Sequence, residues 1–142
     1  MKTLKQLLQA KPVGILSIRS DAPVLDALKL MAERNVGALL VIDEGRLVGI
    51  LSERDYARKV VLKATSSLDT PVREIMTDKV VCVDPGKSVE ECMALVTERR
   101  IRHLPVMEGG KLIGVLSIGD LVKEMISDQQ FTIEQLAHYI HR

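Results

Sequence analysis

The chain has 142 residues, of which 46% are hydrophobic and 2% aromatic, and its formal net charge at pH 7 is +1. This length supports one sizeable core, whereas two halves of about sixty residues would each be marginally stable alone. The nearly neutral charge and the absence of Trp argue against nucleic acid or an anionic membrane surface as a partner.

The N-terminus and the cysteines bear on the cellular compartment. The apolar run in residues 1–8 is too short for a signal peptide or a spanning helix, so we expect a cytoplasmic protein. Cys82 and Cys92 lie ten residues apart, without a CxxC motif or a nearby histidine. We therefore expect two reduced thiols rather than a metal site or a redox pair.

The first half of the chain predicts short helices that alternate with apolar strands. Hydrophobic residues recur at helical spacing in three segments, and two apolar runs flank the turn Asp43-Glu44-Gly45. In chain order, the expected elements are a helix over 2–10, a strand over 15–18, a helix over 24–35, strands over 37–42 and 46–51, and a helix over 52–62. Leu4, Leu7 and Leu8 share one face of the first helix, which we expect to dock on the rest of the protein.

The polar segment 63–70, followed by Pro71, is the only convincing linker. Beyond it the cycle returns as a helical turn over 72–76, a strand over 80–83, a helix over 89–99, strands over 103–107 and 111–116, and a helix over 118–126. Thr132 and Gln135 then predict a capping box for a last helix. This last helix has an apolar face that needs a partner.

The returning cycle reflects an internal duplication. The stretch Gly49-Ile50-Leu51-Ser52-Glu53-Arg54-Asp55 reappears 65 residues later as Gly114-Val115-Leu116-Ser117-Ile118-Gly119-Asp120. The same offset, without a gap, aligns Val24 with Val89 and Leu39 with Leu104. A register kept over this length indicates two copies of one structural unit.

Each copy of the stretch ends in a Ser, two variable residues and an Asp at the expected start of a helix. The structural interpretation is a helix cap, in which Ser52 and Asp55, and likewise Ser117 and Asp120, satisfy helix-start N–H groups. The functional interpretation is that each ionised Asp accepts hydrogen bonds from both hydroxyls of a ribose, while the helix start attracts phosphate. Spacing alone favours the cap, and the duplication favours the ribose anchor, because both copies would then face a shared cleft.

Basic residues near these motifs are candidates for phosphate binding. Arg54 and Arg58 lie one helical turn apart, where they form either a phosphate clamp or a solvated basic face. Arg102 and His103 stand at the entrance of a buried strand, where the histidine is either a ligand contact or a structural residue. The pair Lys123-Glu124 makes a poorer clamp, so we expect the first Asp to define the better phosphate site.

Aliphatic side chains would have to hold any ring system, because aromatic residues are so few. The candidates to enclose an adenine are apolar residues near the strand ends, namely Ile15, Leu16, Val80, Val81 and Pro105. All of them are equally at home in a hydrophobic core.

No catalytic arrangement is evident in the sequence. Ser52 and Ser117 lack a histidine partner that repeats with them, and neither a P-loop nor a GxGxxG motif is present. We therefore expect a protein that binds a ligand and reports its presence, rather than an enzyme, with no catalytic cofactor and no metal site.

The order strand, helix, strand, strand, helix, given twice and closed each time by the Ser-x-x-Asp stretch, resembles the tandem form of the CBS domain (named for cystathionine β-synthase), the Bateman module. Met76-Thr77 and the stretch 102–106, Arg-His-Leu-Pro-Val, are further features of that family. The resemblance implies an α/β (α+β) fold of two β-α-β-β-α repeats with quasi-two-fold symmetry, flanked by short N- and C-terminal helices.

The implied domains are an N-terminal helix and linker over 1–14, repeat one over 15–62, a linker over 63–79, repeat two over 80–126 and a C-terminal helix over 127–142. Similar proteins commonly bind AMP, ATP, NAD or S-adenosylmethionine in the cleft between the repeats. The resemblance therefore implies a regulatory, signal-transducing homodimer that binds an adenine nucleotide, and it places Arg102 and His103 among the nucleotide contacts.

Two other functions stay open. The unequal repeats, with Gly37-Ala38 in one and Arg102-His103 in the other, and the amphipathic ends fit a dimeric scaffold or regulatory subunit for an unidentified protein target, with a weak or lost nucleotide site. The basic cluster over 99–103 fits a nucleic-acid binder, but the near-neutral charge and the few aromatic residues count against it. We expect neither nucleic acid nor a membrane as a partner.

Overall fold

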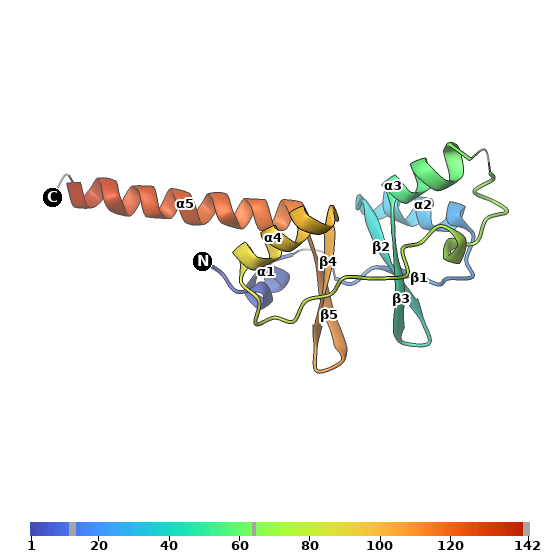
Figure 1. The fold of residues 1–142 in the computed structure, drawn as a ribbon, viewed down its shortest axis with the longest axis horizontal. Coiled ribbons are helices and arrows are strands. Elements are labelled where there is room, and N and C mark those ends of the chain that lie inside the picture. Colours follow the sequence, from blue (N-terminus) through green and yellow to red (C-terminus); the bar gives the residue numbers. More distant parts are fainter. Residues whose placement is uncertain (12–13, 64, 141–142) are drawn as a thin grey trace. The chain divides into compact units, whose positions relative to one another are not determined.

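The computed structural model describes residues 1–11, 14–63 and 65–140 (Figure 1). The chain forms two compact units: unit 1 comprises Met1–Gly14 and Val81–Arg142, and unit 2 comprises Ile15–Val80. Unit 2 thus contains the first repeat and the segment after it, whereas unit 1 joins the second repeat to the N-terminal segment. Within the described ranges, no helix has both the length and the apolar composition needed to cross a membrane.

Unit 2 contains a three-stranded sheet in the order β1-β2-β3, with β1 parallel and β3 antiparallel to β2. Its elements are β1 (Ser17–Ile18), α2 (Val24–Arg34), β2 (Ala38–Asp43), β3 (Arg46–Ser52), α3 (Glu53–Tyr56), the π-helix η1 (Ala57–Val61) and the 3-10 helix η2 (Val72–Glu74). The apolar stripe of α2 packs on the sheet, where Val24, Met31 and Leu39 are buried in one core. The helix expected to continue to Leu62 is present, with a π-helical second half.

Unit 1 contains the antiparallel hairpin of β4 (His103–Glu108) and β5 (Lys111–Ser117). Its helices are α1 (Leu4–Ala10), α4 (Val89–Arg99) and α5 (Ile118–Ile140). Leu4 is fully buried in the core of this unit together with Cys92 and Leu104, which confirms the expected docking of the first helix. Both cysteines are free thiols, and burial raises the pKa of each.

The duplication is confirmed by irregular features that recur 65 residues apart. Each hairpin has a register shift at the same place, between Val41 and Ile42 in β2 and between Val106 and Met107 in β4. The two long helices of the repeats each end in a residue with left-handed backbone, at Asn35 and Arg100. The repeats therefore agree in backbone detail as well as in sequence.

Two expectations about individual elements are wrong. The strand expected over 80–83 is reduced to an isolated parallel bridge between Val83 and Val106, because only Val83 exchanges hydrogen bonds with β4. The capping box expected at Thr132 and Gln135 does not exist, since α5 runs unbroken from Ile118 to Ile140. The Thr132 hydroxyl instead donates to the carbonyl of Asp128, four residues earlier, as hydroxyls inside helices do.

The segment that leads into each repeat packs on the hairpin of the other repeat. Thr77 pairs with Ile50 of β3 in unit 2, and α1 contacts β5 in unit 1. A Cβ at Gly49 would lie 2.5 Å from Sδ of Met76 and 3.0 Å from the carbonyl oxygen of Thr77, and a Cβ at Gly114 would lie 2.6 Å from Cδ2 of Leu8. The repeated glycine therefore provides the space that the leading segment occupies.

We expect Gly49→Ala to lower the free energy of unfolding by about 1–3 kcal/mol, the usual cost of overpacking, because the backbone at Thr77 has to shift. Gly37→Ala is the matched control, since a Cβ there meets nothing within 4 Å. Urea unfolding of both variants measures the difference. Equal stabilities would show that this contact does not require glycine.

Candidate functional site

In unit 2, Ser52 and Asp55 form a capping box at the junction of β3 and α3. The Ser52 amide donates to Oδ2 of Asp55 (3.0 Å), and the Asp55 amide donates to Oγ of Ser52 (3.2 Å). Lys59 lies 3.5 Å from the other carboxylate oxygen, Oδ1, and also donates to the carbonyl of Ile75 (3.0 Å). Both oxygens of Asp55 are therefore engaged within unit 2.

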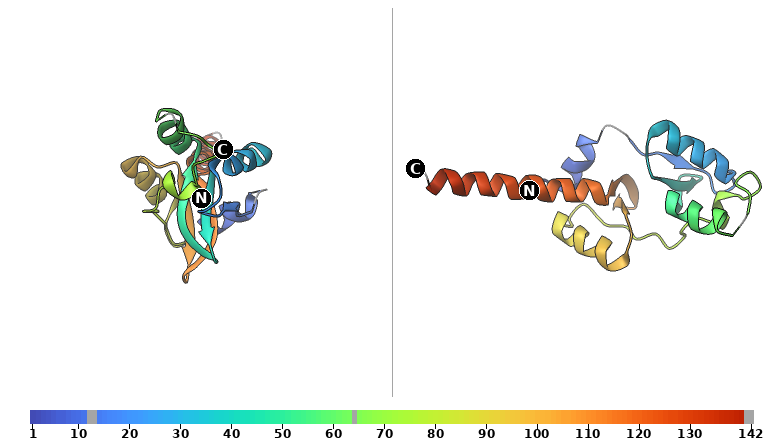
Figure 2. Two further views of the ribbon diagram at one scale, coloured as in Figure 1. Left: turned by 90° about the vertical axis from the view of Figure 1, so that its right-hand side faces the viewer. Right: turned by 90° about the horizontal axis from the view of Figure 1, so that it is seen from above.

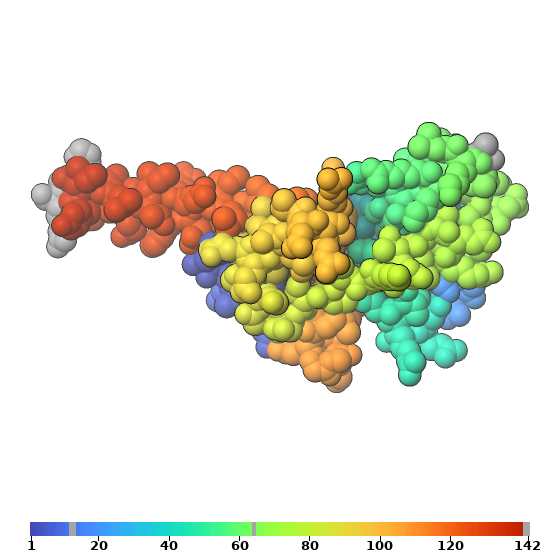
Figure 3. Space-filling model, viewed as in Figure 1, coloured from blue at the N-terminus to red at the C-terminus, as the bar shows by residue number. Residues whose placement is uncertain are grey.

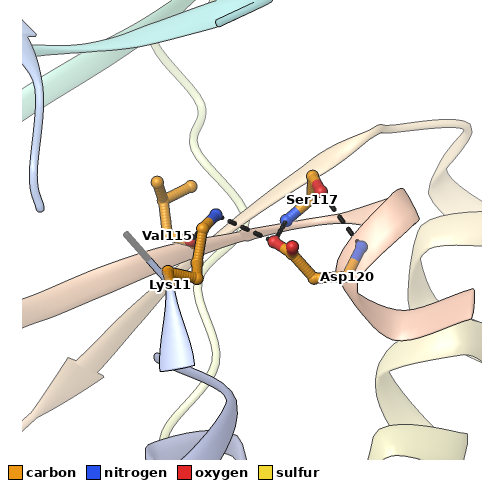
Figure 4. A network of polar contacts seen from close by, with 4 residues as sticks. All are labelled: Lys11, Val115, Ser117 and Asp120. Atoms are coloured by element: carbon orange, nitrogen blue, oxygen red, sulfur yellow. Dashed lines mark hydrogen bonds and ion pairs between the residues drawn. The ribbon is translucent and has the colours of Figure 1, made fainter. Parts of the chain in front are cut away.

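In unit 1, the same arrangement recurs where β5 passes into α5, and Lys11 is added to it (Figure 4). The Ser117 amide donates to Oδ2 of Asp120 (2.8 Å), and the Asp120 amide donates to Oγ of Ser117 (3.1 Å). The ammonium of Lys11 donates to the same Oδ2 (2.8 Å) and to the carbonyl of Val115 (2.9 Å). The capping interpretation of both Ser-x-x-Asp motifs is confirmed.

The lysine at the carboxylate comes from a different place in each unit. In unit 2 it is Lys59, one helical turn after Asp55, and the equivalent position in unit 1 holds Glu124. In unit 1 it is Lys11, just after α1, and the equivalent position in unit 2 holds Met76. Comparison of the repeats gives no signal for Lys11, which sequence reasoning missed, because its counterpart is not a cation.

Hydrogen bonds fix the Asp120 carboxylate, but in the described residues they reach only one of its two oxygens. Burial alone would raise the pKa of its carboxyl group, but the hydrogen bonds from Lys11 and Ser117 and the charge of Lys11 lower that pKa below its usual range. Its side chain is 28% exposed. In the described part of the chain, no group donates a hydrogen bond to its Oδ1, so this ionised oxygen can accept hydrogen bonds from a ligand.

A pocket of about 280 Å³ lies beside Asp120 in unit 1. Residues of the N-terminal segment and of α5 line it, namely Lys2, Leu7, Ala10, Lys11, Asp120, Lys123, Glu124 and Ser127. Three of these side chains are cationic and two are acidic, and Glu124 is only 7% exposed. Lys123 was expected near the second Asp, but Lys2 and Lys11 were not, because they come from a segment far away in the sequence.

His103 begins β4, where it pairs with Ser117 in the hairpin. Burial lowers the pKa of its imidazole, and the positive charges of Lys11 and Arg102 lower it further, against the opposing effect of Asp120. Arg102 is exposed, and its carbonyl accepts a hydrogen bond from the Ile118 amide (2.8 Å). The structure therefore brings His103, Lys11 and Asp120 into one electrostatic cluster.

The remaining expected site residues are distributed over both units. Arg54 and Arg58 are exposed, and neither has an ion pair in the described ranges. Leu16 packs on the core of unit 2, Val81 packs on the core of unit 1, and Pro105 is buried in β4, as their structural interpretation requires. Ile15 and Val80 belong to unit 2, where Ile15 is exposed and Val80 is half-buried. A purine site formed by these apolar residues stays a prediction.

The sequence and the fold match known proteins. The family model of the CBS domain matches residues 6–62 and 72–127. The CBS domain-containing protein CBSX3, mitochondrial, of Arabidopsis thaliana is 41% identical over 126 residues, 85% of this chain. The match covers 61% of the plant protein, less than two thirds of its length.

Two solved structures illustrate the structural match. A protein with CBS domains from Burkholderia ambifaria MC40-6 is 58% identical, with a TM-score of 0.86 over 93% of this chain and 99% of that one. The CBS domain pair of protein MJ0100, in complex with 5′-methylthioadenosine and S-adenosyl-L-methionine, has a TM-score of 0.77 over 90% of this chain and 98% of that one. The identity to MJ0100 is 22%, so this second likeness shows the fold alone.

We expect Lys11→Met, which introduces the residue type of the equivalent Met76, to raise the pKa of Asp120. A carboxyl group with a lowered pKa in the folded state stabilises the fold above its unfolded pKa of about 3.9, and this contribution is lost as the pH falls through the folded-state pKa. The variant should lose part of that contribution. Carboxyl carbon NMR titration measures the pKa, and Lys123→Met is the control, since it alters the same pocket without removing the ion pair. An equal pKa of Asp120 in the wild type, Lys11→Met and Lys123→Met would contradict the role assigned to Lys11.

His103 should make the fold less stable in mild acid. Because its folded-state pKa lies below the unfolded value of about 6.5, the stability is fully present above that pH and is lost as the pH falls. His103→Gln should therefore flatten the pH dependence of the unfolding free energy between pH 7 and pH 5, measured in urea. His138→Gln, on the exposed end of α5, is the control and should behave as the wild type. An unchanged slope in His103→Gln would refute this role.

Proposed function

Because this chain belongs to the CBS-domain family and contains two copies of that domain, we propose that it is a regulatory module that binds an adenine nucleotide and catalyses no reaction of its own. The ligands expected from the sequence are AMP, ATP and NAD, or a related adenosyl compound. The hydroxyls of Ser52 and Ser117 accept helix-start amides, which is a capping role and not that of a nucleophile.

The observation that carries this proposal is the hydrogen bonding of the two carboxylate oxygens of Asp120. Its Oδ2 is bonded by Ser117 and Lys11, and its Oδ1 faces no donor in the described residues. A carboxylate oxygen can accept two hydrogen bonds, so Oδ1 has room for two neighbouring hydroxyls of a ribose. The helix start already fixes the carboxylate, and binding would therefore cost little ordering of this side chain.

The cations near each Asp supply the phosphate contacts in this proposal. In unit 1, Lys2, Lys11 and Lys123 line the pocket beside Asp120, where their ammonium groups would offset phosphate charge. In unit 2, Arg54 and Arg58 have no ion pair among the described residues and are accessible to a phosphate. The expectation that the first Asp has the better phosphate site, and that both anchors share a cleft, stays a prediction.

The ligands of MJ0100 support the choice of ligand class. That CBS pair holds 5′-methylthioadenosine and S-adenosyl-L-methionine, which share the adenosyl group. We carry over only this shared chemistry, as part of the proposal. Homodimerisation and a cytoplasmic location, both expected above, also belong to the proposal, although the Arabidopsis relative is mitochondrial by name.

An interaction scaffold is the second candidate, and α5 favours it. The last turns of this helix expose Ile133, Leu136 and Ile140 on one face, each at least 58% accessible. Exposed apolar clusters of this kind commonly mark protein contacts. A scaffold would bind its partner irrespective of nucleotide, whereas a sensor would not.

Calorimetry with AMP, ADP, ATP, NAD and S-adenosylmethionine tests the proposal. We expect at least one ligand to bind, and Asp120→Asn to weaken it by about tenfold or more, because an ionised acceptor of hydroxyl groups is lost. Asp55→Asn should have a smaller effect, since both oxygens of Asp55 are already engaged. Asp78→Asn, at an exposed position, is the control. The absence of heat with all five ligands would refute the function.

A second variant separates the ligand site from the fold. Lys123→Met alters the pocket without touching the cap, so it should weaken ATP but leave 5′-methylthioadenosine, which has no phosphate, unchanged. Undiminished binding of every ligand to both Asp120→Asn and Lys123→Met would show that the ligand binds elsewhere on the protein.

A further inference from the structure

The last helix carries an apolar stripe whose side chains are exposed, increasingly so toward its C-terminal end. Five aliphatic side chains form the stripe, with exposures from 37% at Val122 to 74% at Ile140, the others being Ile126, Ile133 and Leu136. The right-hand view in Figure 2 and the space-filling view in Figure 3 show α5 continuing past α1 and α4 of the same unit. Every described residue from Gln129 on is exposed.

The stripe has the spacing of a coiled coil. From Val122 the positions advance by four, three, four, three and four residues through Ile126, Gln129, Ile133, Leu136 and Ile140. In heptad terms, isoleucine fills every a position and Val122, Gln129 and Leu136 fill the d positions. The 19 residues from Val122 to Ile140 span about 27 Å of helix, which is long enough for two and a half heptads.

The stripe contains no charged residue, and the one charged residue at its edge is Lys123, beside Val122. From Met125 on, the positions that flank the stripe are Met125, Gln130, Thr132, Ala137 and Tyr139, all neutral at pH 7. The acidic residues Glu124, Asp128 and Glu134 lie on other faces of the helix. Two identical copies of this face can therefore meet without repulsion between like charges.

We infer that a second copy of this chain covers the stripe, and that the two α5 helices pair in parallel as a short coiled coil. The inference rests on the proposed homodimer and names its surface. A second copy is the occupant that the pattern fits, because β-branched isoleucine at every a position, with Leu136 at one d position, favours a two-stranded pair. A twelve-residue helical end with no cover is also only marginally stable in water, and pairing removes that weakness.

Gln129 sets the direction of the pair. In a parallel pair each d residue meets its own copy, so the two Gln129 amides can donate to and accept from each other. In an antiparallel pair each a residue meets a d residue, and Gln129 would face Ile133, which offers no hydrogen bond. The single polar position within the stripe is therefore satisfied only in the parallel arrangement.

The first experiment compares two variants of the full chain by analytical ultracentrifugation. Ile133→Asp places a charge inside the stripe and should raise the dimer dissociation constant by about 100-fold or more. Phe131→Asp is the matched control, because Phe131 is equally exposed on the opposite face and should leave the dimer intact. Circular dichroism melting of both variants checks that unit 1 stays folded.

The outcomes separate this inference from the homodimer itself. If the wild type is a monomer at tens of micromolar, the homodimer and this surface both fail. If the wild type is a dimer that Ile133→Asp leaves unchanged, the homodimer stands and α5 is not its surface. Weakening by Phe131→Asp to the same extent would also overturn the assignment of the stripe. Nucleotide binding is measured separately, so its loss or presence does not affect this result.

The second experiment tests the parallel direction by disulfide formation. Leu136→Cys is made in a Cys82→Ser background, because Cys82 is exposed and could form an unrelated link. In a parallel pair the two introduced thiols face each other, and mild oxidation should give a covalent dimer. A noncovalent dimer that does not cross-link at this position would overturn the parallel arrangement.

Discussion

In each unit, a leading segment packs against the last strand of a hairpin at a position where only a glycine leaves room. Gly49 accommodates Met76 and Thr77, and Gly114 accommodates Leu8. This contact ties the start of one repeat to the body of the other. In unit 1 the same packing places Lys11, which follows α1, at the junction of β5 and α5, where it contacts Asp120. The geometry of the candidate site therefore depends on the close approach of Leu8 to β5 at Gly114.

Because Lys11 reaches Asp120, the carboxylates of Asp55 and Asp120 differ chemically, although both take part in the same kind of helix cap. Asp55 is paired with a lysine on its own helix, and both of its oxygens are engaged. Asp120 is paired with a lysine from the distant N-terminal segment, which leaves Oδ1 without a donor in the described residues. The pKa of His103 is lowered by burial first and then by the charge of Lys11, and the same lysine lowers the pKa of Asp120.

One helix links the proposed ligand site with the proposed partner surface. Asp120 lies in the first turn of α5, and the apolar stripe begins at Val122 and continues along the same helix. An α-helix is stiff over this length, so a shift of its first turn moves the stripe as well. Energetic coupling requires that ligand and partner each prefer one position of a shared element, and α5 is the element that both would bias.

The sequence by itself determined the duplication, the order of elements, the capping motifs and the family, because each depends on local spacing or on a repeated pattern. It did not reveal that Lys11 pairs with Asp120, since the partners are 109 residues apart and the repeat offset aligns Lys11 with a methionine. Nor did it show that α5 continues through Thr132. The hydroxyl of this residue, which could have capped a new helix, donates to the carbonyl of Asp128 instead. Tertiary structure decided these points, because long-range contacts and the continuation of a helix depend on the free energy of the whole fold and not on the residues at one place.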